Sequence, residues 1–324
     1  MKHVYSFISI LSTVFFIGFQ ILCGQNQEPN KLALTSKKLL QTTNIQVSSW
    51  TIGFYSGSSP FNLSSPGGIK NPVLTASVVT DLNVDIVAHP FMVVTDSSYF
   101  VFFTAKDGKT DKGGIGLAES KNGKDWKYRQ IVIHESFVLA YPYVFKWKND
   151  YFMIPEAHTE TSVRLYRATH FPDKWKYEGD LLSGEKFISS TVVHYKNMWW
   201  MFTAPGGNES LRLFYANDLK GQWTEHPQSP IVKKNLDIAR PGGRPLIIDG
   251  TLYRLGQDCD PTYGNQVHAF EITEITTSTY KEKMIETPLV KATGTGWNSD
   301  AMHHVDAQQV GKNKWVAVVD ALGK

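Results

Sequence analysis

Short β-like stretches of apolar residues follow one another along most of the chain, and turn dipeptides separate them. These turns include Asp107-Gly108, Asn122-Gly123, Gly206-Gly207 and Asp249-Gly250. Such dipeptides supply the positive φ angles that tight hairpins need. The pattern therefore predicts a chain built of β-strands joined by hairpins.

The β-like stretches recur with a period of about fifty residues. Three copies align in full over residues 89–126, 141–175 and 190–223, and their closing residues Trp126, Trp175 and Trp223 stand 49 and 48 positions apart. A fourth copy at 244–280 is looser, and a fifth begins near 303 with only two strands. Repeats of four strands at this period are typical of a β-propeller. We therefore predict an all-β, five-bladed β-propeller over residues 47–324.

The fifth repeat needs outer strands from elsewhere in the chain. The segment 48–55, from Ser48 to Tyr55, is β-like and precedes the first repeat. We expect this N-terminal strand to complete the fifth blade and close the propeller, which removes exposed sheet edges.

An apolar run from Val4 to Cys23 follows the basic Lys2. It predicts a signal peptide over residues 1–24, or a signal anchor because the run is long enough to span a membrane. Residues 25–46 are polar and are expected to form a stem or linker. The sequons at Asn62 and Asn208 support a secretory route with N-glycosylation. We expect secretion, or residence in the Golgi or endoplasmic reticulum lumen if the segment remains as an anchor.

Composition and charge exclude several classes of function. The chain has 324 residues, 42% hydrophobic and 19% charged, with a net charge of +3. This balance argues against a nucleic-acid-binding protein, and we expect membrane contact only through an uncleaved N-terminal segment. Cys23 and Cys259 are the two cysteines. Because Cys23 lies in the leader, Cys259 is predicted to be unpaired and buried.

In a propeller the first strand of each blade lines the central channel, so a site is expected where these strands begin. Candidate residues on or near the first strands are His89, Tyr141, Ser190 or its neighbour Ser189, Arg244, His303 and His304. Further candidates nearby are Glu156, Arg240, Gln257, Asp258 and Asp306. We expect His89, Tyr141, Glu156, Arg240, Arg244, one of the two histidines and Asp306 to converge at one mouth of the channel. Strand alternation predicts that only one of His303 and His304 faces the channel.

Each candidate also has a structural explanation. Glu156 can accept hydrogen bonds from the backbone or from an arginine, and Arg240 and Arg244 suit either an anionic ligand or ion pairs that tie blades together. His303, His304 and Asp306 carry atoms that can bind a cation, but their spacing matches no strong metal signature. We therefore expect no cofactor and no resident metal, with a channel cation as the alternative.

Seven motifs together resemble one family. They are Ala88-His89-Pro90-Phe91, Tyr141-Pro142-Tyr143-Val144, Met153-Ile154-Pro155-Glu156, Arg212-Leu213-Phe214-Tyr215-Ala216, Ala239-Arg240-Pro241-Gly242-Gly243-Arg244, Gln257-Asp258-Cys259 and Met302-His303-His304-Val305-Asp306. This series resembles the propeller domain that precedes the transferase domain in glucosamine inositolphosphorylceramide transferases, a fold related to five-bladed arabinanases and furanosidases. The resemblance covers about residues 48–324. The chain is expected to lack the separate transferase domain.

The resemblance implies a carbohydrate-related function with three alternatives. Furanosidases of this fold carry carboxylates where this chain has His89, Tyr141 and Ser190, which favours a non-catalytic module that binds a glycan or a glycolipid headgroup. The second alternative is a glycosidase with Glu156 as the acid and Asp306, or a histidine such as His89, as the base. In the third alternative the chain is an accessory subunit of a separate glycosyltransferase.

Overall fold

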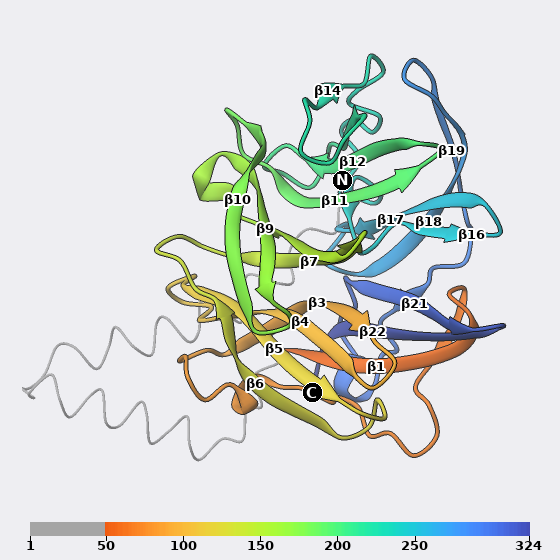
Figure 1. The fold of residues 1–324 in the computed structure, drawn as a ribbon. Helices are drawn as coiled ribbons and strands as arrows, with labels where there is room; N and C mark the ends of the chain where they lie inside the picture. Colours follow the sequence, from red (N-terminus) through yellow and green to blue (C-terminus); the bar gives the residue numbers. More distant parts are fainter. Residues whose placement is uncertain (1–48) are drawn as a thin grey trace, which may run out of the picture. The chain divides into compact units, whose positions relative to one another are not determined.

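The computed structural model describes residues 49–324, which form five antiparallel sheets arranged in a ring (Figure 1). The predicted five-bladed, all-β fold is confirmed. The expected signal segment at 1–24 and the linker at 25–46 lie outside the described residues. Within residues 49–324, no helix has the length and apolar character needed to cross a membrane.

The strands follow the order of the sequence repeats. The first blade contains β3 (Ile86–Val94), β4 (Tyr99–Lys106), β5 (Gly113–Ser120) and β6 (Trp126–Ile133). The second contains β7 (Ala140–Trp147), β8 (Asp150–Glu156), β9 (Ser162–His170) and β10 (Lys174–Ser183). The third contains β11 (Ile188–Tyr195), β12 (Met198–Ala204), β13 (Arg212–Ala216) and β14 (Thr224–Glu225).

The last two blades depart from this regular plan. The fourth contains β15 (Arg240–Pro241), β16 (Leu246–Ile248), β17 (Thr251–Asp258), β18 (Gln266–Ile275), β19 (Tyr280–Met284) and β20 (Val290–Lys291). The fifth contains β21 (Val305–Gly311), β22 (Lys314–Gly323), β1 (Ser49–Ser59) and β2 (Asn62–Ser64). Short 3₁₀ turns lie in the connections, at η2 (Ala76–Val78), η3 (His158–Glu160) and η4 (Gly296–Asn298).

The strand predicted near residues 48–55 is present as β1 in the fifth sheet. It pairs antiparallel with β22 in unbroken register, from Ser49 opposite Gly323 to Gly57 opposite Trp315. On its other edge it pairs with the short β2. The two ends of the described chain therefore share one sheet.

The repeated tryptophans occupy equivalent places. Trp126 begins β6, Trp175 is the second residue of β10, and Trp223 precedes β14. Each indole N–H donates to a carbonyl of the turn just before it, at Gly123 (2.9 Å), Pro172 (2.9 Å) and Leu219 (3.2 Å), respectively. The tryptophan thus fastens the turn into the outermost strand of each of these blades.

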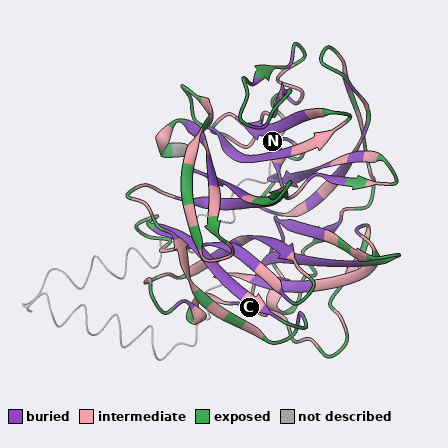
Figure 2. Ribbon diagram, viewed as in Figure 1, coloured by how far each residue is buried: buried purple, intermediate pink, exposed green. Residues whose placement is uncertain are grey.

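The core lies mainly between adjacent blades, and the inner strands are the most deeply buried (Figure 2). Aromatic pairs cross these boundaries, with ring centroids 5.5–6.4 Å apart, at Phe102–Trp175, Phe145–Trp199, Phe202–Tyr280 and Phe54–Tyr99. Cys259 is buried and forms no disulfide with another described residue, as predicted.

The strands of blade four show why the fourth sequence repeat matches the others less closely. Its first strand is broken into β15 and β16, which both pair with β17 on either side of the Gly242-Gly243 insertion. Gly243 has a φ of 152°, and a Cβ there would lie 1.9 Å from the carbonyl oxygen of Val305 in the fifth blade. Only glycine permits this close approach, and it allows Arg244 to enter the channel.

Candidate functional site

Three first strands share an unusual backbone conformation near their start. His89, Tyr141 and Ser189 are left-handed, with φ angles of 49°, 47° and 51°. Each lies in a bulge where the pairing of the first and second strands shifts register. Non-glycine residues rarely adopt this conformation, and when they do they concentrate at functional sites. The strain therefore marks this end of the channel.

A side chain from the preceding blade holds each of these left-handed residues. The backbone N–H of His89 donates to Asp320 Oδ2 (2.8 Å), that of Tyr141 to Thr104 Oγ1 (3.0 Å), and that of Ser189 to Glu156 Oε2 (2.9 Å). Thr104, Glu156 and Asp320 all lie at or near the end of a second strand. Ties between neighbouring blades thus maintain the shape of the mouth.

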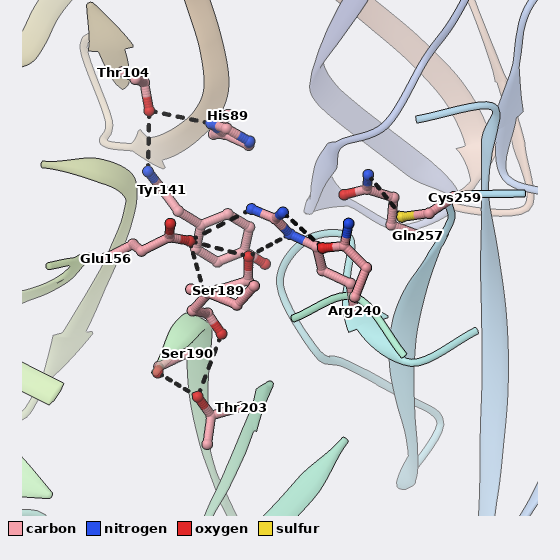
Figure 3. A network of polar contacts seen from close by, with 12 residues as sticks. His89, Thr104, Tyr141, Glu156, Ser189, Ser190, Thr203, Arg240, Gln257 and Cys259 are labelled. Carbon is pink, nitrogen blue, oxygen red and sulfur yellow. Dashed lines mark hydrogen bonds and ion pairs between the residues drawn. The ribbon is translucent and has the colours of Figure 1, made fainter. Parts of the chain in front are cut away.

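Glu156 and Arg240 form the charged centre of this mouth (Figure 3). Arg240 Nη2 lies 3.5 Å from Glu156 Oε2, and Arg240 Nε donates to Ser189 Oγ at 3.0 Å. Arg240 Nη1 donates to Asn208 Oδ1 at 3.0 Å, so this predicted glycosylation residue lies beside the site. The side chains of Arg240 and Glu156 are only 11% and 7% exposed, so both charged groups are largely shielded from water.

Three histidine rings lie beside this charged pair. The ring centroid of His89 is 4.7 Å from that of His303 and 6.0 Å from that of His304. His303 and His304 precede β21 rather than lie in it. Strand alternation therefore does not govern them, and both rings lie next to that of His89.

Hydrogen bonds orient the histidine rings. Thr104 Oγ1 accepts from the Tyr141 amide and lies 3.2 Å from His89 Nδ1, so the hydroxyl proton can be donated to that nitrogen. The other ring nitrogen, Nε2, is a buried atom with no hydrogen-bond partner among the described residues, and it carries the proton of the neutral ring when Thr104 donates to Nδ1. Burial, followed by the nearby His303 and Arg240, holds the pKa of His89 well below its usual value. The His89 ring is therefore neutral, and its Nε2 is available for a hydrogen bond to a ligand.

Asp320 fixes the second ring. Its Oδ1 lies 2.6 Å from His303 Nδ1, and its Oδ2 accepts from the His89 amide. His304 Nε2 donates to the carbonyl of Pro90 at 3.0 Å, and burial lowers the pKa of His304 to about 4. Asp320 is fully buried, and its two oxygens hold residues of the fifth and first blades together.

Aromatic side chains form one wall of the mouth. Trp50 stacks on His303 with 3.9 Å between ring centroids, and Tyr263 meets both rings edge-on. The Tyr263 side chain is among the most exposed large apolar groups described, at 42%, and the Arg240 guanidinium lies 5.5 Å from its ring centroid. An exposed ring beside fixed polar groups suits a ligand with both apolar and hydroxylated faces.

Arg244 and Asp306 do not join this mouth. Arg244 Nε and Nη2 bind the two oxygens of Asp306 at 2.6 and 3.1 Å, and Nη2 also donates to the carbonyls of Met92 and Val144. Met92 and Val144 lie three residues beyond His89 and Tyr141, about 10 Å farther along their strands. The pair therefore ties four blades, as in the structural alternative for Arg244. Arg244, with its side chain 17% exposed, also lines a separate pocket of about 330 Å³ together with Met92, Val144 and Gln308.

The remaining predicted residues have structural contacts. Ser190 Oγ pairs with Thr203 Oγ1 at 2.7 Å, and Gln257 Nε2 donates to Cys259 Sγ at 3.2 Å. Asp258 accepts from Asn265, Gln266 and the amide of Asp260, which orders the loop after β17. Asn62 is exposed on β2. Among residues 49–324, no cluster of three or more His, Cys, Asp or Glu side chains is arranged to hold a metal ion.

Four residues of this mouth escaped the sequence reasoning: Trp50, Thr104, Tyr263 and Asp320. Aligning the repeats could have identified two of them, Thr104 and Asp320. Thr104 pairs with Ala88 just as Glu156 pairs with Ala140, and Asp320 donates its N–H to the carbonyl of His304 at the same level of the fifth blade. Trp50 and Tyr263 lie outside the repeat register, so no periodic signal marks them.

Comparisons with known proteins identify the family of this chain. Residues 43–322 match the family described as glucosamine inositolphosphorylceramide transferase 1, N-terminal. The chain is 38% identical over 296 residues to glucosamine inositolphosphorylceramide transferase 1 of Oryza sativa subsp. japonica, and 33% identical over 298 residues to that of Arabidopsis thaliana. Each match covers 84% of this chain but only 40% and 39% of the relatives, so the chain spans about two fifths of their length.

Solved structures share the fold at low sequence identity. The catalytic domain of a Coprinopsis cinerea family 62 α-L-arabinofuranosidase matches at a TM-score of 0.58 and 12% identity, covering 82% of this chain and 96% of that one. An exo-β-1,3-galactanase from Clostridium thermocellum matches at 0.54 and 12%, covering 68% and 54%. These likenesses show the propeller fold alone, whereas the family match is specific. The chain belongs to the family of N-terminal propeller domains of the glucosamine inositolphosphorylceramide transferases.

Proposed function

We propose that the mouth formed by Glu156, Arg240 and His89 binds a glycan or the headgroup of a glycolipid. One observation carries this proposal: the Glu156–Arg240 pair and the neutral His89, whose Nε2 has no hydrogen-bond partner among the described residues, lie beside the exposed residue Tyr263. Sugar hydroxyls both donate and accept hydrogen bonds, so they can satisfy Glu156, Arg240 and His89 together. The names of the relatives and of the structural neighbours, which concern sugar transfer and glycoside hydrolysis, support a carbohydrate ligand.

Binding is favoured over hydrolysis by the state of the carboxylates. An inverting glycosidase needs an acid and a base carboxyl that both face the bond, roughly 6.5–9.5 Å apart. Asp306 and Asp320 are fully buried, and both oxygens of each accept hydrogen bonds from the protein. Asp306 and Asp320 are therefore poorly placed to act as the second carboxyl that the glycosidase alternative needs. In the expected catalytic first-strand places the chain carries His89, Tyr141 and Ser190, none of which is a carboxylate. The same holds if Ser189, which shares the left-handed bulge of His89 and Tyr141, is taken in place of Ser190.

This module would act in the lumen of the secretory pathway or outside the cell. The exposed Asn62 sequon and the basic, apolar N-terminal segment support that location. In such a setting the domain presents a glycan or glycolipid headgroup to a glycosyltransferase, either a separate chain or a domain like the one in the relatives.

Saturation-transfer NMR and calorimetry can test the proposal. The probes are methyl α-L-arabinofuranoside, methyl β-D-galactopyranoside, methyl α-D-glucosaminide and myo-inositol 1-phosphate. We expect at least one to bind, and Glu156→Gln or Arg240→Met to weaken it by about 10–100-fold, since hydrogen bonds to charged groups contribute about 1.5–3 kcal/mol. Arg129→Met, at an exposed arginine of β6, is the matched control.

Two results would decide against binding at this mouth. The first is that no probe binds the folded wild-type protein. The second is that binding survives both site variants. Release of nitrophenol from the matching nitrophenyl glycosides, lost in Glu156→Gln, would instead favour the glycosidase alternative.

A further inference from the structure

A second cavity opens between the first and second blades. Its volume is about 630 Å³, and three connections line it: the β4–β5 turn with Thr110 and Lys112, the β6–β7 segment 134–138, and η3 with Thr159 and Glu160. This volume falls within the range of about 300–1,000 Å³ typical of ligand sites. None of these residues belongs to the mouth described above.

The cavity lies next to that mouth. Val138 precedes Tyr141 by three residues, and Thr159 follows Glu156 by three. Because consecutive Cα atoms are 3.8 Å apart, neither lining residue is more than about 11 Å from a residue of the mouth. Connections that leave the starts of first strands and the ends of second strands emerge at the same face of the ring, so both openings share that face.

The cavity wall is held in place by the second blade. The Arg164 guanidinium lies 4.7 Å from the ring centroid of Phe137 and 3.0 Å from Glu160 Oε2. Tyr166 donates its hydroxyl to Glu135 Oε1 at 3.0 Å. One aromatic ring and two carboxylates are thus oriented before any ligand arrives, which lowers the entropic cost of binding.

The lining has the chemistry of a sugar subsite. Phe137 offers a half-buried apolar ring, while Thr110, Lys112 and Thr159 are exposed polar groups around it. An apolar surface beside donors and acceptors matches a pyranose or furanose ring, which has an apolar face and hydroxyl edges.

We propose that this cavity is a second sugar subsite, and that the ligand is an oligosaccharide of at least two units. Its chain runs from the mouth at Glu156 and Arg240 outward over the boundary between blades one and two. This inference rests on the proposed function, because the first sugar occupies that mouth.

Calorimetric titration with 1,5-α-L-arabino-oligosaccharides and 1,3-β-D-galacto-oligosaccharides of one to four units tests it. For the wild-type protein we expect affinity for one series to rise at least about 5-fold from one unit to three. Thr159→Trp fills the cavity from an exposed position, and Phe137→Ala removes the ring. Both variants should lose the gain with length and keep the affinity for the single sugar. Thr273→Trp, at an exposed threonine of β18, is the matched control.

The outcomes separate this inference from the proposed function. Wild-type affinity that does not depend on chain length overturns the second subsite, while binding at the mouth still stands. A gain with length that persists in Thr159→Trp also overturns it. If neither series binds at any length and the single-sugar probes also fail, the mouth itself is not a glycan site and the subsite falls with it.

Discussion

Replacing Arg244 with alanine should destabilise the propeller without affecting glycan binding by the folded protein. The guanidinium makes four hydrogen bonds, two to Asp306 and one each to the carbonyls of Met92 and Val144. The Asp306 side chain is fully buried. Burial disfavours the charged form of Arg244, but Asp306 and Tyr143 together outweigh it and raise the pKa of Arg244. The Arg244 guanidinium is therefore charged over the whole accessible pH range.

The expected cost follows from the carboxylate that is left behind. Removing one partner of a buried ion pair typically costs about 3–5 kcal/mol, because the remaining charge is desolvated and uncompensated. For a domain of this size each kcal/mol lowers Tm by about 2 °C, so we expect Arg244→Ala to melt about 6–10 °C lower. Arg244→Lys should fall between, since it keeps the charge and loses the two-pronged contact.

Thermal and urea unfolding followed by circular dichroism would measure these changes, and a cycle with Asp306→Ala would isolate the pair. We expect the two single changes to couple by about 1–3 kcal/mol. A free energy of unfolding within about 0.5 kcal/mol of the wild type, the range typical of surface substitutions, would refute the role of the pair as a tie between blades. Unchanged stability with lost glycan binding would show that Arg244 holds an anionic ligand instead.

Three further predictions concern the rest of the domain. Burial lowers the pKa of His304 from 6.5 to about 4, so between these pH values the unfolded state binds more protons than the folded state. The free energy of unfolding should therefore fall by about 3 kcal/mol as the pH drops from about 6.5 to 4. In His304→Gln the free energy of unfolding should change less steeply with pH across this window, and an equal pH dependence would contradict the prediction. Cys259 is buried and burial raises the pKa of its thiol, so a thiol reagent should label it slowly in the native protein and rapidly in denaturant; rapid native labelling would count against this. Deleting residues 49–59 removes the strand paired with β22 and exposes its edge, so we expect insoluble protein, whereas a soluble deletion variant with a cooperative melt would show that β1 is dispensable.

Much of the fold is readable from local sequence. The tryptophan at the start of each outermost strand and the Asn-Gly or Asp-Gly turns act within a few residues, as the bond from Trp126 to Gly123 shows. A repeated local interaction leaves a repeated sequence signal. For the same reason the count of blades, the strand at β1 and the burial of Cys259 were predictable.

The arrangement of the site depended on contacts between distant repeats. Asp320 and His89 are 231 positions apart, and no local pattern indicates that the carboxylate of one supports the strained backbone of the other. Likewise the insertion Gly242-Gly243 looks like a turn in the sequence. Only its approach to Val305 shows that it breaks the first strand of blade four.

The sequence by itself thus determined the type of fold and which residues could form a channel site, because hairpin periodicity is a short-range property. The tertiary structure decided which of those residues share one mouth of the channel and which lie elsewhere. Closing the ring brought Glu156, Arg240 and His89 to one mouth and placed Arg244 with Asp306 away from it, beside a separate pocket. Which residues share the mouth depends on the positions of the first strands relative to one another along the channel. Those positions are fixed only when the five blades pack together.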